Sequence, residues 1–256
     1  MYLDTVHKMA ESAVIKKRFI QKSLLKYLIL SAMAGIYVGF GIMLIFSIGA
    51  PFAAVHSSAT KILMGVSFGV ALTLVIFAGS ELFTGNNMVM MLGRLTQKVT
   101  TKDAINIWTF SYIGNLVGSL FFAYLIAKSG LIANEPQSAL ILKAAAEKMN
   151  APFGQLFIRG ILCNMLVCLA IWTSTRAKED ISKLLLIWWC LFAFIGAGFE
   201  HSIANMSLLG MALFIPHDPT FISIVGFIKN LIVVTAGNFV GGTLFIGAMY
   251  WYVSKE

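Results

Sequence analysis

One glutamate and one histidine lie together where a charged side chain is costly, within a long apolar stretch. Glu200 and His201 are adjacent, and His201 is the one histidine that we place within a predicted span, since His7, His56 and His217 fall in the tail or in loops. An imidazole beside a carboxylate can exchange a proton with a substrate or donate a hydrogen bond to a passing anion. A second glutamate, Glu81, lies in a similar stretch and is followed three residues later by the hydroxyl of Thr84. These residues are the candidates for chemistry, and they allow either catalysis or transport.

Catalysis would make Glu200 and His201 the acid and base of a membrane-embedded enzyme. Other enzyme motifs are missing, because the chain has no nucleophile elbow, no His-Glu-x-x-His metal motif and no Gly-rich phosphate loop. The three cysteines are too few and too far apart for a metal site, and we interpret them as small core residues: Cys163, Cys168 and Cys190. We therefore expect no enzyme, no metal and no cofactor.

The elements that position these residues are predicted from composition. Of 256 residues, 59% are hydrophobic and 12% are charged, whereas soluble domains are about 25% charged. A bilayer-spanning helix needs about 20 mostly apolar residues. Six uncharged stretches fit this length, two of them only with their weakly polar flanks: 27–60, 62–80, 104–127, 160–175, 184–199 and 230–254. The sequence predicts an all-α integral membrane protein with six transmembrane helices, and excludes a soluble enzyme, a disulfide scaffold and a disordered chain.

The basic residues predict the topology. The net charge is +8, but Lys and Arg flank the apolar spans and do not gather on one soluble face, so we expect no nucleic-acid partner. If both termini lie on one side, that side carries thirteen of the nineteen Lys and Arg residues. This bias predicts cytoplasmic termini. Residues 1–26 have apolar residues at helical spacing and are predicted to form an amphipathic helix at the cytoplasmic interface, as a surface anchor or a gate, before a single transmembrane domain, 27–256.

Two short motifs each occur twice. The segment 78–81, Ala-Gly-Ser-Glu, recurs as Ala-Gly-Phe-Glu at 197–200, which is 119 residues later. The segment 114–118, Gly-Asn-Leu-Val-Gly, recurs as Gly-Asn-Phe-Val-Gly at 237–241, which is 123 residues later. Each half then holds three spans. Because three is an odd number, the second half enters the membrane from the opposite side, so the halves form an inverted repeat with a pathway at their interface. The Gly-xxx-Gly spacing of the second motif indicates close helix packing, and we assign that motif no chemistry.

The glutamate motifs indicate broken helices in the second and fifth spans. In both copies the apolar run ends at the glutamate although the span still has membrane to cross, and an asparagine follows five residues later: Asn86 after Glu81, and Asn205 after Glu200. Irregular backbone at membrane depth is tolerated where it is buried in protein or lines a wet cavity. We expect these residues to support the breaks. The half-helix N-termini would then favour an anion near the centre.

Three segments resemble the formate/nitrite transporter family: Leu-Phe-Thr-Gly at 82–85, Glu-His-Ser-Ile-Ala-Asn-Met at 200–206, and the run 166–172. The resemblance covers nearly the whole chain. It implies an aquaporin-like fold in the bacterial cytoplasmic (inner) membrane, assembled as a homopentamer in the lipid bilayer with one pore in each protomer. The order and positions of Thr84, Lys148 and His201 resemble the hydrosulfide channel branch best, and the nitrite channel branch is the other one considered.

The same resemblance implies roles for individual residues. His201 would be the central histidine, Thr84 the omega-loop threonine, Asn164 a pore-facing residue between two slits, and Lys148 a cation in the extracytoplasmic vestibule. The implied slits are Phe68, Leu72 and Phe194 on the extracytoplasmic side, and Leu82, Phe83 and Val167 on the cytoplasmic side. A positive charge at Lys148 would concentrate small monovalent anions at the pore mouth.

Two mechanisms and one rival substrate class remain open. A bare anion in an apolar slit faces a desolvation penalty on the order of tens of kcal/mol. Either His201, Thr84, Asn164 and the half-helix N–H groups replace its water, or a proton from water or His201 converts it to a neutral weak acid. The rival is a neutral-solute channel of the aquaporin kind, which would place Asn-Pro-Ala signatures in its half-helices, and neither break has one. The sequence does not choose between hydrosulfide, nitrite and formate.

Overall fold

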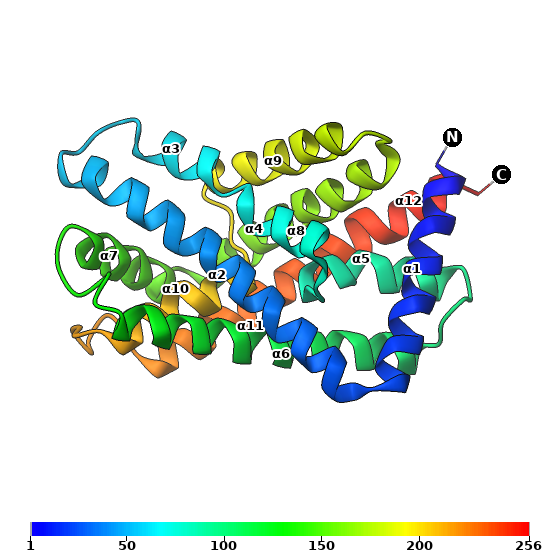
Figure 1. Cartoon of the computed structure of the whole chain (residues 1–256), viewed down its shortest axis with the longest axis horizontal. Coiled ribbons are helices and arrows are strands. Elements are labelled where there is room, and N and C mark those ends of the chain that lie inside the picture. The colour runs from blue at the N-terminus through cyan, green and yellow to red at the C-terminus, as the bar shows by residue number, and fades with distance from the viewer. Residues whose placement is uncertain (1, 256) are drawn as a thin grey trace.

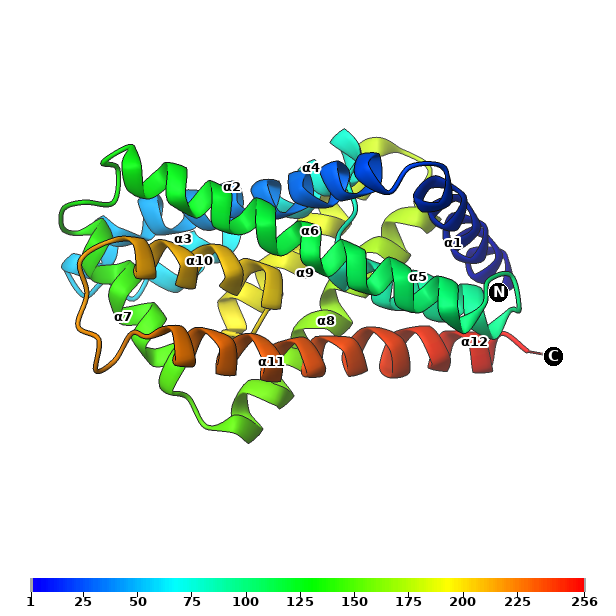
Figure 2. The same cartoon turned by 90° about the horizontal axis from the view of Figure 1, so that it is seen from below.

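The computed structural model describes residues 2–255 as a bundle of helices, with no strand among them (Figure 1). Both ends of the chain lie at one end of the bundle, and Figure 2 shows α1 crossing that end. The elements are α1 (Leu3–Lys22), α2 (Leu24–Ala54), α3 (Thr60–Ser67), α4 (Val70–Leu74), η1 (Val75–Gly79), α5 (Phe83–Leu95), α6 (Thr101–Lys128), α7 (Gln137–Asn150), α8 (Phe153–Arg176), α9 (Asp180–Ala197), α10 (Ser202–Phe214), α11 (Ile224–Val240), η2 (Gly241–Ala248) and α12 (Met249–Val253), where η marks a π-helical turn.

Six helical segments within residues 2–255 are long and apolar enough to cross a membrane, which confirms the predicted number. Two are composite: α3, α4 and η1 form the segment Thr60–Gly79, and α11, η2 and α12 form Ile224–Val253. The first predicted stretch is too long at its end, because α2 stops at Ala54, soon after Pro51. Loss of a backbone donor at a proline weakens the helix that would continue there.

The N-terminal helix α1 packs across the end of the bundle that holds both termini. Its buried face is formed by Val6, Met9, Ala10 and Ala13, and it contacts α5 and α2. Lys17 forms an ion pair with Asp103 at the start of α6, with 2.8 Å between Nζ and Oδ2. Within residues 1–26, which are predicted to form an amphipathic helix, the structure has a helix at Leu3–Lys22. Its place at the membrane surface stays a prediction.

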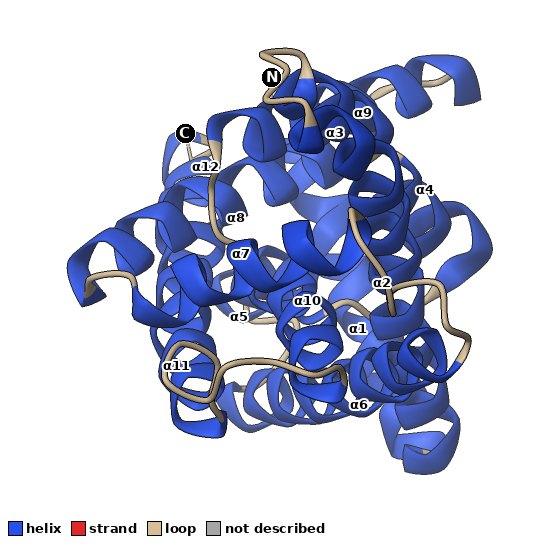
Figure 3. Ribbon diagram, turned by 90° about the vertical axis from the view of Figure 1, so that its left-hand side faces the viewer, coloured by secondary structure: helices blue, strands red, loops and turns tan. Residues whose placement is uncertain are grey.

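Helix α7 lies at the opposite end of the bundle and faces the viewer in Figure 3. The sequence predicts six spans and an N-terminal helix, with no helix between the third and fourth spans, and the structure has one there, Gln137–Asn150. Ile141, Ala145 and Met149 recur every fourth residue and are all buried. That spacing gives a helix one apolar stripe. Lys148 is thereby fixed on a helix.

Helix η1 stops at Gly79, and α9 stops at Ala197 before Gly198. Both glycines have positive φ angles, +80° at Gly79 and +75° at Gly198. This left-handed conformation is costly for residues with a Cβ atom. A few non-helical residues follow each glycine, and a new helix then begins, α5 at Phe83 and α10 at Ser202. These matched interruptions support the broken-helix and inverted-repeat interpretation, which stays a prediction.

Gly198 offers a test of the backbone argument. A Cβ at Gly198 would meet no atom within 4 Å, so Gly198→Ala changes only backbone strain. We expect it to lower the free energy of unfolding by about 1–2 kcal/mol. Gly196→Ala, two residues earlier inside α9, should instead raise it by up to about 1 kcal/mol. Thermal unfolding of the purified variants in detergent measures both, and melting temperatures that shift in the same direction would refute the argument.

Candidate pore and its polar centre

Three cavities follow one another through the protein. The first, here called the α7 vestibule, has a volume of about 670 Å³ and is lined by residues of α2, α3, α7, α9 and α10. The second, about 10 Å³, shares Phe194 and His201 with the first. The third, here called the α1 vestibule, has a volume of about 460 Å³ and shares Leu82 with the second. Because consecutive cavities share lining residues, they trace one path between the two ends of the bundle.

The central cavity is apolar and narrow. Phe68, Leu72 and Phe194 all line it, and the rings of Phe68 and Phe194 meet edge to face with centroids 5.5 Å apart. Leu82 and Val167 line it as well. Its volume is roughly the least that holds one water molecule. An ion can therefore pass only if the lining side chains move.

Phe83 is the one predicted slit residue that lines none of the three cavities. It is buried and packs edge to face on Tyr112, with ring centroids 5.1 Å apart. Its backbone begins α5, whose first turn also carries Thr84. The structure thus places Phe83 beside the path, where it anchors the start of α5.

His201 lines the α7 vestibule and the central cavity, and it contacts Thr84, which lines none of the three cavities. The Nε2 atom of His201 lies 2.9 Å from Oγ1 of Thr84, and both side chains are buried. The Nδ1 atom of His201 accepts a hydrogen bond of 3.1 Å from the N–H of Ala204, which caps the start of α10. An accepting Nδ1 leaves the proton of a neutral imidazole on Nε2. His201 therefore donates to Thr84, and the hydroxyl hydrogen of Thr84 remains available to another acceptor.

The same pair brings two helix N-termini together. Thr84 lies in the first turn of α5, and His201 is the N-cap residue of α10. Helix N-termini carry partial positive charge. Two of them converge beside the apolar central cavity, so this part of the protein is electrostatically suited to a negative charge.

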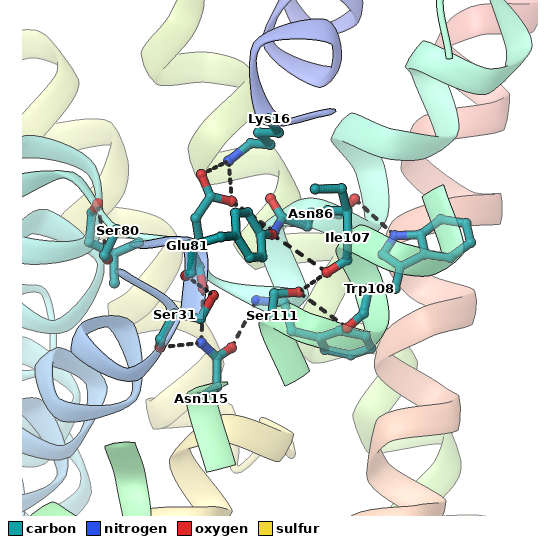
Figure 4. A network of polar contacts seen from close by, with 12 residues as sticks. Lys16, Ser31, Ser80, Glu81, Asn86, Ile107, Trp108, Ser111 and Asn115 are labelled. Carbon is teal, nitrogen blue, oxygen red and sulfur yellow. Dashed lines mark hydrogen bonds and ion pairs between the residues drawn. The ribbon is translucent and has the colours of Figure 1, made fainter. Parts of the chain in front are cut away.

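Glu200 and Glu81 are held by matching sets of side chains. Glu200 accepts from Nζ of Lys148 at 2.7 Å and from Nδ2 of Asn205 at 2.6 Å. Glu81 accepts from Nζ of Lys16 at 2.8 Å and from Nδ2 of Asn86 at 3.1 Å (Figure 4). The Tyr27 hydroxyl also donates to Glu81, at 3.2 Å. Each carboxylate thus binds a lysine from an amphipathic helix, α7 or α1, and the asparagine five residues further along.

The freed backbone groups at the two breaks are bound by Asn115 and Asn238, the asparagines of the repeated Gly-Asn motif. Asn115 accepts from the N–H of Phe83 at 2.9 Å and donates to the carbonyl oxygens of Ser31 and Glu81 (Figure 4). Its amide is fully buried. A buried backbone N–H without a partner costs about 1–3 kcal/mol, so this side chain stabilises the break.

Asn238 repeats this arrangement in the second half. It accepts from the N–H of Ser202 at 2.8 Å and donates to the carbonyl oxygens of Gly160 and Glu200, at 2.7 and 2.8 Å. Sequence reasoning assigned these motifs packing alone and missed both asparagines. The sequence does carry an indication of this role: an asparagine recurs at the same place in two apolar spans, where an unpaired polar group is energetically unfavourable. The packing itself is present, because a Cβ on Gly118 would overlap the carbonyl oxygen of Ala32.

Asn164 joins the two halves. Its Nδ2 atom donates to the carbonyl oxygens of Thr84 at 3.2 Å and of Asn238 at 2.6 Å, while its Oδ1 atom has no partner within residues 2–255. It does not line any of the three cavities. Its predicted role as a pore-facing residue stays a prediction. In the structure it positions the backbone of Thr84.

Two observations bear on the enzyme alternative. Residues 65–69 have the Gly-x-Ser-x-Gly spacing of a nucleophile elbow, but they continue a helical segment, and the hydroxyl of Ser67 donates to the carbonyl of Leu63. An elbow needs a sharp strand-to-helix turn. Within the described residues no group of three His, Cys, Asp or Glu side chains could hold a metal ion.

Comparison with known proteins decides the family. The family model described as "Formate/nitrite transporter" matches residues 3–252. The chain belongs to this family. It is 42% identical to the nitrite transporter NirC of Salmonella typhimurium, over all of this chain and 93% of that protein. It is 37% identical over 244 residues to a probable formate transporter of Methanothermobacter thermautotrophicus, covering 89% and 88% of the two chains.

Solved structures agree with the predicted fold. A channel described as an "FNT family ion channel" has 42% sequence identity and a TM-score of 0.94, with 98% of this chain and 99% of that chain covered. A "pentameric formate channel with formate bound" has 30% identity and a TM-score of 0.79, with 91% and 98% covered. The resemblance stated from the sequence and the all-helical membrane fold are thereby confirmed. The relatives are named as transporters and channels, in keeping with the expectation of a protein without enzymatic activity.

Proposed function

We propose that this chain conducts small monovalent anions, nitrite first among them, across the bacterial cytoplasmic membrane through a pore in each protomer of a homopentamer. The observation that carries the proposal is the His201–Thr84 pair: the two side chains lie 2.9 Å apart, and His201 lines both the α7 vestibule and the apolar central cavity. Nitrite comes first because the chain is 42% identical to nitrite transporters from Salmonella typhimurium and Escherichia coli. Formate and hydrosulfide are the further candidates.

The charge distribution supports an orientation. Lys and Arg residues favour the end that holds both termini, so that end is proposed to be cytoplasmic. The α1 vestibule then opens to the cytoplasm and the α7 vestibule to the outside.

His201 is proposed to act as a neutral hydrogen-bond donor. Its Nδ1 atom accepts from Ala204, so a second proton on the ring would remove the cap of α10. Loss of the Nε2 proton would leave an imidazolate in an apolar centre, which is strongly unfavourable. The proton that neutralises an anion is therefore proposed to come from water in a vestibule. The neutral acid then crosses the constriction while Thr84, held by His201, donates its hydroxyl hydrogen to the passing species.

The pH dependence of uptake tests this mechanism. With the purified protein in liposomes, nitrite uptake should rise as the external pH is lowered from about 8 to about 5, because more of the anion is protonated. The measurement is the initial rate at fixed total nitrite. A rate that is independent of pH and follows an imposed membrane potential would contradict the neutral-acid mechanism and favour passage of the charged anion. Swelling with small neutral solutes and no anion flux would favour the aquaporin-like alternative.

A further inference from the structure

The cations of the α7 vestibule are of two kinds. Lys148 lines the vestibule, but its ammonium is bound to Glu200 at 2.7 Å, and the carboxylate is almost completely buried. Its charge is therefore largely compensated. Lys61, at the start of α3, and Lys143, on α7, line the same cavity and are exposed. Within residues 2–255 neither forms an ion pair or a side-chain hydrogen bond. The unpaired positive charge of this cavity thus comes from these two lysines, and the exposed carboxylate of Glu147 opposes part of it.

A histidine lies at the rim of the same cavity. His56 lies in the turn between α2 and α3, is exposed, and lines the vestibule. Its backbone has a φ of +53°, a conformation that few side chains adopt. Its imidazole has no hydrogen bond or ion pair within the part of the chain that the structure describes. Histidine changes its charge between about pH 5 and 8.

We infer that the α7 vestibule is an anion-capture site formed by Lys61 and Lys143, with a charge that His56 sets according to the pH outside. This inference rests on the proposed function, because it assigns the step that precedes passage through the constriction. The ligand class is a small monovalent anion that exchanges rapidly and keeps most of its water. The predicted role of Lys148 in drawing anions in passes to the two unpaired lysines.

The groups that face this cavity give its charge. From α3 there is Lys61, and from α7 there are Lys143, Glu147 and Lys148, the last paired with Glu200. If the Lys148–Glu200 pair is counted as neutral, Lys61 and Lys143 contribute two positive charges and Glu147 one negative charge. The net charge of the cavity is then +1, and protonation of His56 raises it to +2. In a wet cavity, a unit charge roughly 6 Å from an anion raises the local anion concentration about two- to threefold at 10 mM salt and hardly at all at 1 M.

The lysines are tested by uptake into right-side-out membrane vesicles, in which the α7 vestibule faces the medium. Lys61→Gln and Lys143→Gln should each raise the KM for nitrite about twofold at 10 mM salt, and the double variant about fivefold. Maximal rates should be unchanged, and the differences should vanish at 1 M salt. Lys229→Gln is the matched control, since Lys229 is exposed near the same end, donates to the carbonyl of Ala151 and does not line the vestibule. A double variant with the wild-type KM at low salt would overturn the capture site.

His56 is tested by His56→Asn, because asparagine tolerates a positive φ and does not titrate in this range. The KM of the variant divided by that of the wild type should be near one at pH 8 and about two at pH 5. Taking this ratio removes the effect of pH on the anion itself and on the pore. A ratio that stays constant across the range would overturn the role of His56. If the wild type took up no anion at all, the proposed function would fail; wild-type uptake with unaltered variants would overturn only the capture site.

Discussion

Replacing Asn238 with alanine is expected to lower the free energy of unfolding by about 3 kcal/mol or more. The change removes three hydrogen bonds to buried backbone, those to the N–H of Ser202 and to the carbonyl oxygens of Gly160 and Glu200. Each buried group left unpaired costs about 1–3 kcal/mol. Most single substitutions cost far less. The measurement is thermal unfolding in detergent, together with nitrite flux, because the same bonds fix the start of α10 beside His201.

Two further variants serve as comparisons for Asn238→Ala. Asn115→Ala should cause a comparable loss, since Asn115 makes the corresponding three bonds to Phe83, Ser31 and Glu81. Thr243→Val removes one buried hydroxyl that only donates back to the carbonyl of Phe239, and should cost less than about 1 kcal/mol. If Asn238→Ala unfolded at the same temperature as Thr243→Val, the asparagine would not be holding the break.

Replacing His201 with phenylalanine is expected to reduce nitrite flux at least tenfold. The variant cannot hold the Thr84 hydroxyl, which lies 2.9 Å from Nε2, and presents an apolar ring to the passing species. A hydrogen bond to a charged or strongly polar group contributes about 1.5–3 kcal/mol, which corresponds to roughly 10- to 150-fold in rate. Initial rates of nitrite uptake into liposomes measure the change. A variant that kept the wild-type rate would remove His201 from the pore.

His201→Asn separates the hydrogen bond from the proton. Asparagine is a favoured N-cap residue, so α10 should keep its first turn, and the side chain retains a donor. We expect flux above that of His201→Phe, and a rate that still rises as the pH falls, because the proton is proposed to come from water. A pH profile that became flat in the asparagine variant would show that the imidazole supplies the proton.

The elements and several residues that line the central cavity could be predicted from the sequence, for different reasons. The six spans follow from the scarcity of charge, since a charged residue within a span is expensive enough to leave clear boundaries. The resemblance placed Phe68, Leu72 and Phe194 together, and the structure brings all three to the central cavity. The two glutamates were singled out because a carboxylate at the end of an apolar run needs a partner.

The partners themselves could not be predicted. Lys16 meets Glu81 across 65 residues and Lys148 meets Glu200 across 52, and several lysines could have reached either carboxylate. Asn238 donates to the carbonyl oxygen of Gly160, 78 residues away. A repeated motif indicates that two positions are equivalent, but it does not identify the atoms that either side chain contacts. Helix α7 was not predicted, because its apolar stripe is short and its lysines and glutamate are typical of an exposed loop. Ile141, Ala145 and Met149 nevertheless recur with the period of a helix.

The most direct test is the flux of four anions through the wild-type protein in liposomes: nitrite, formate, hydrosulfide and chloride. We expect nitrite and formate to move rapidly and their flux to be lost in His201→Phe. Chloride, whose acid is fully dissociated, should move much more slowly. If none of the four anions moved, the proposed function would be wrong.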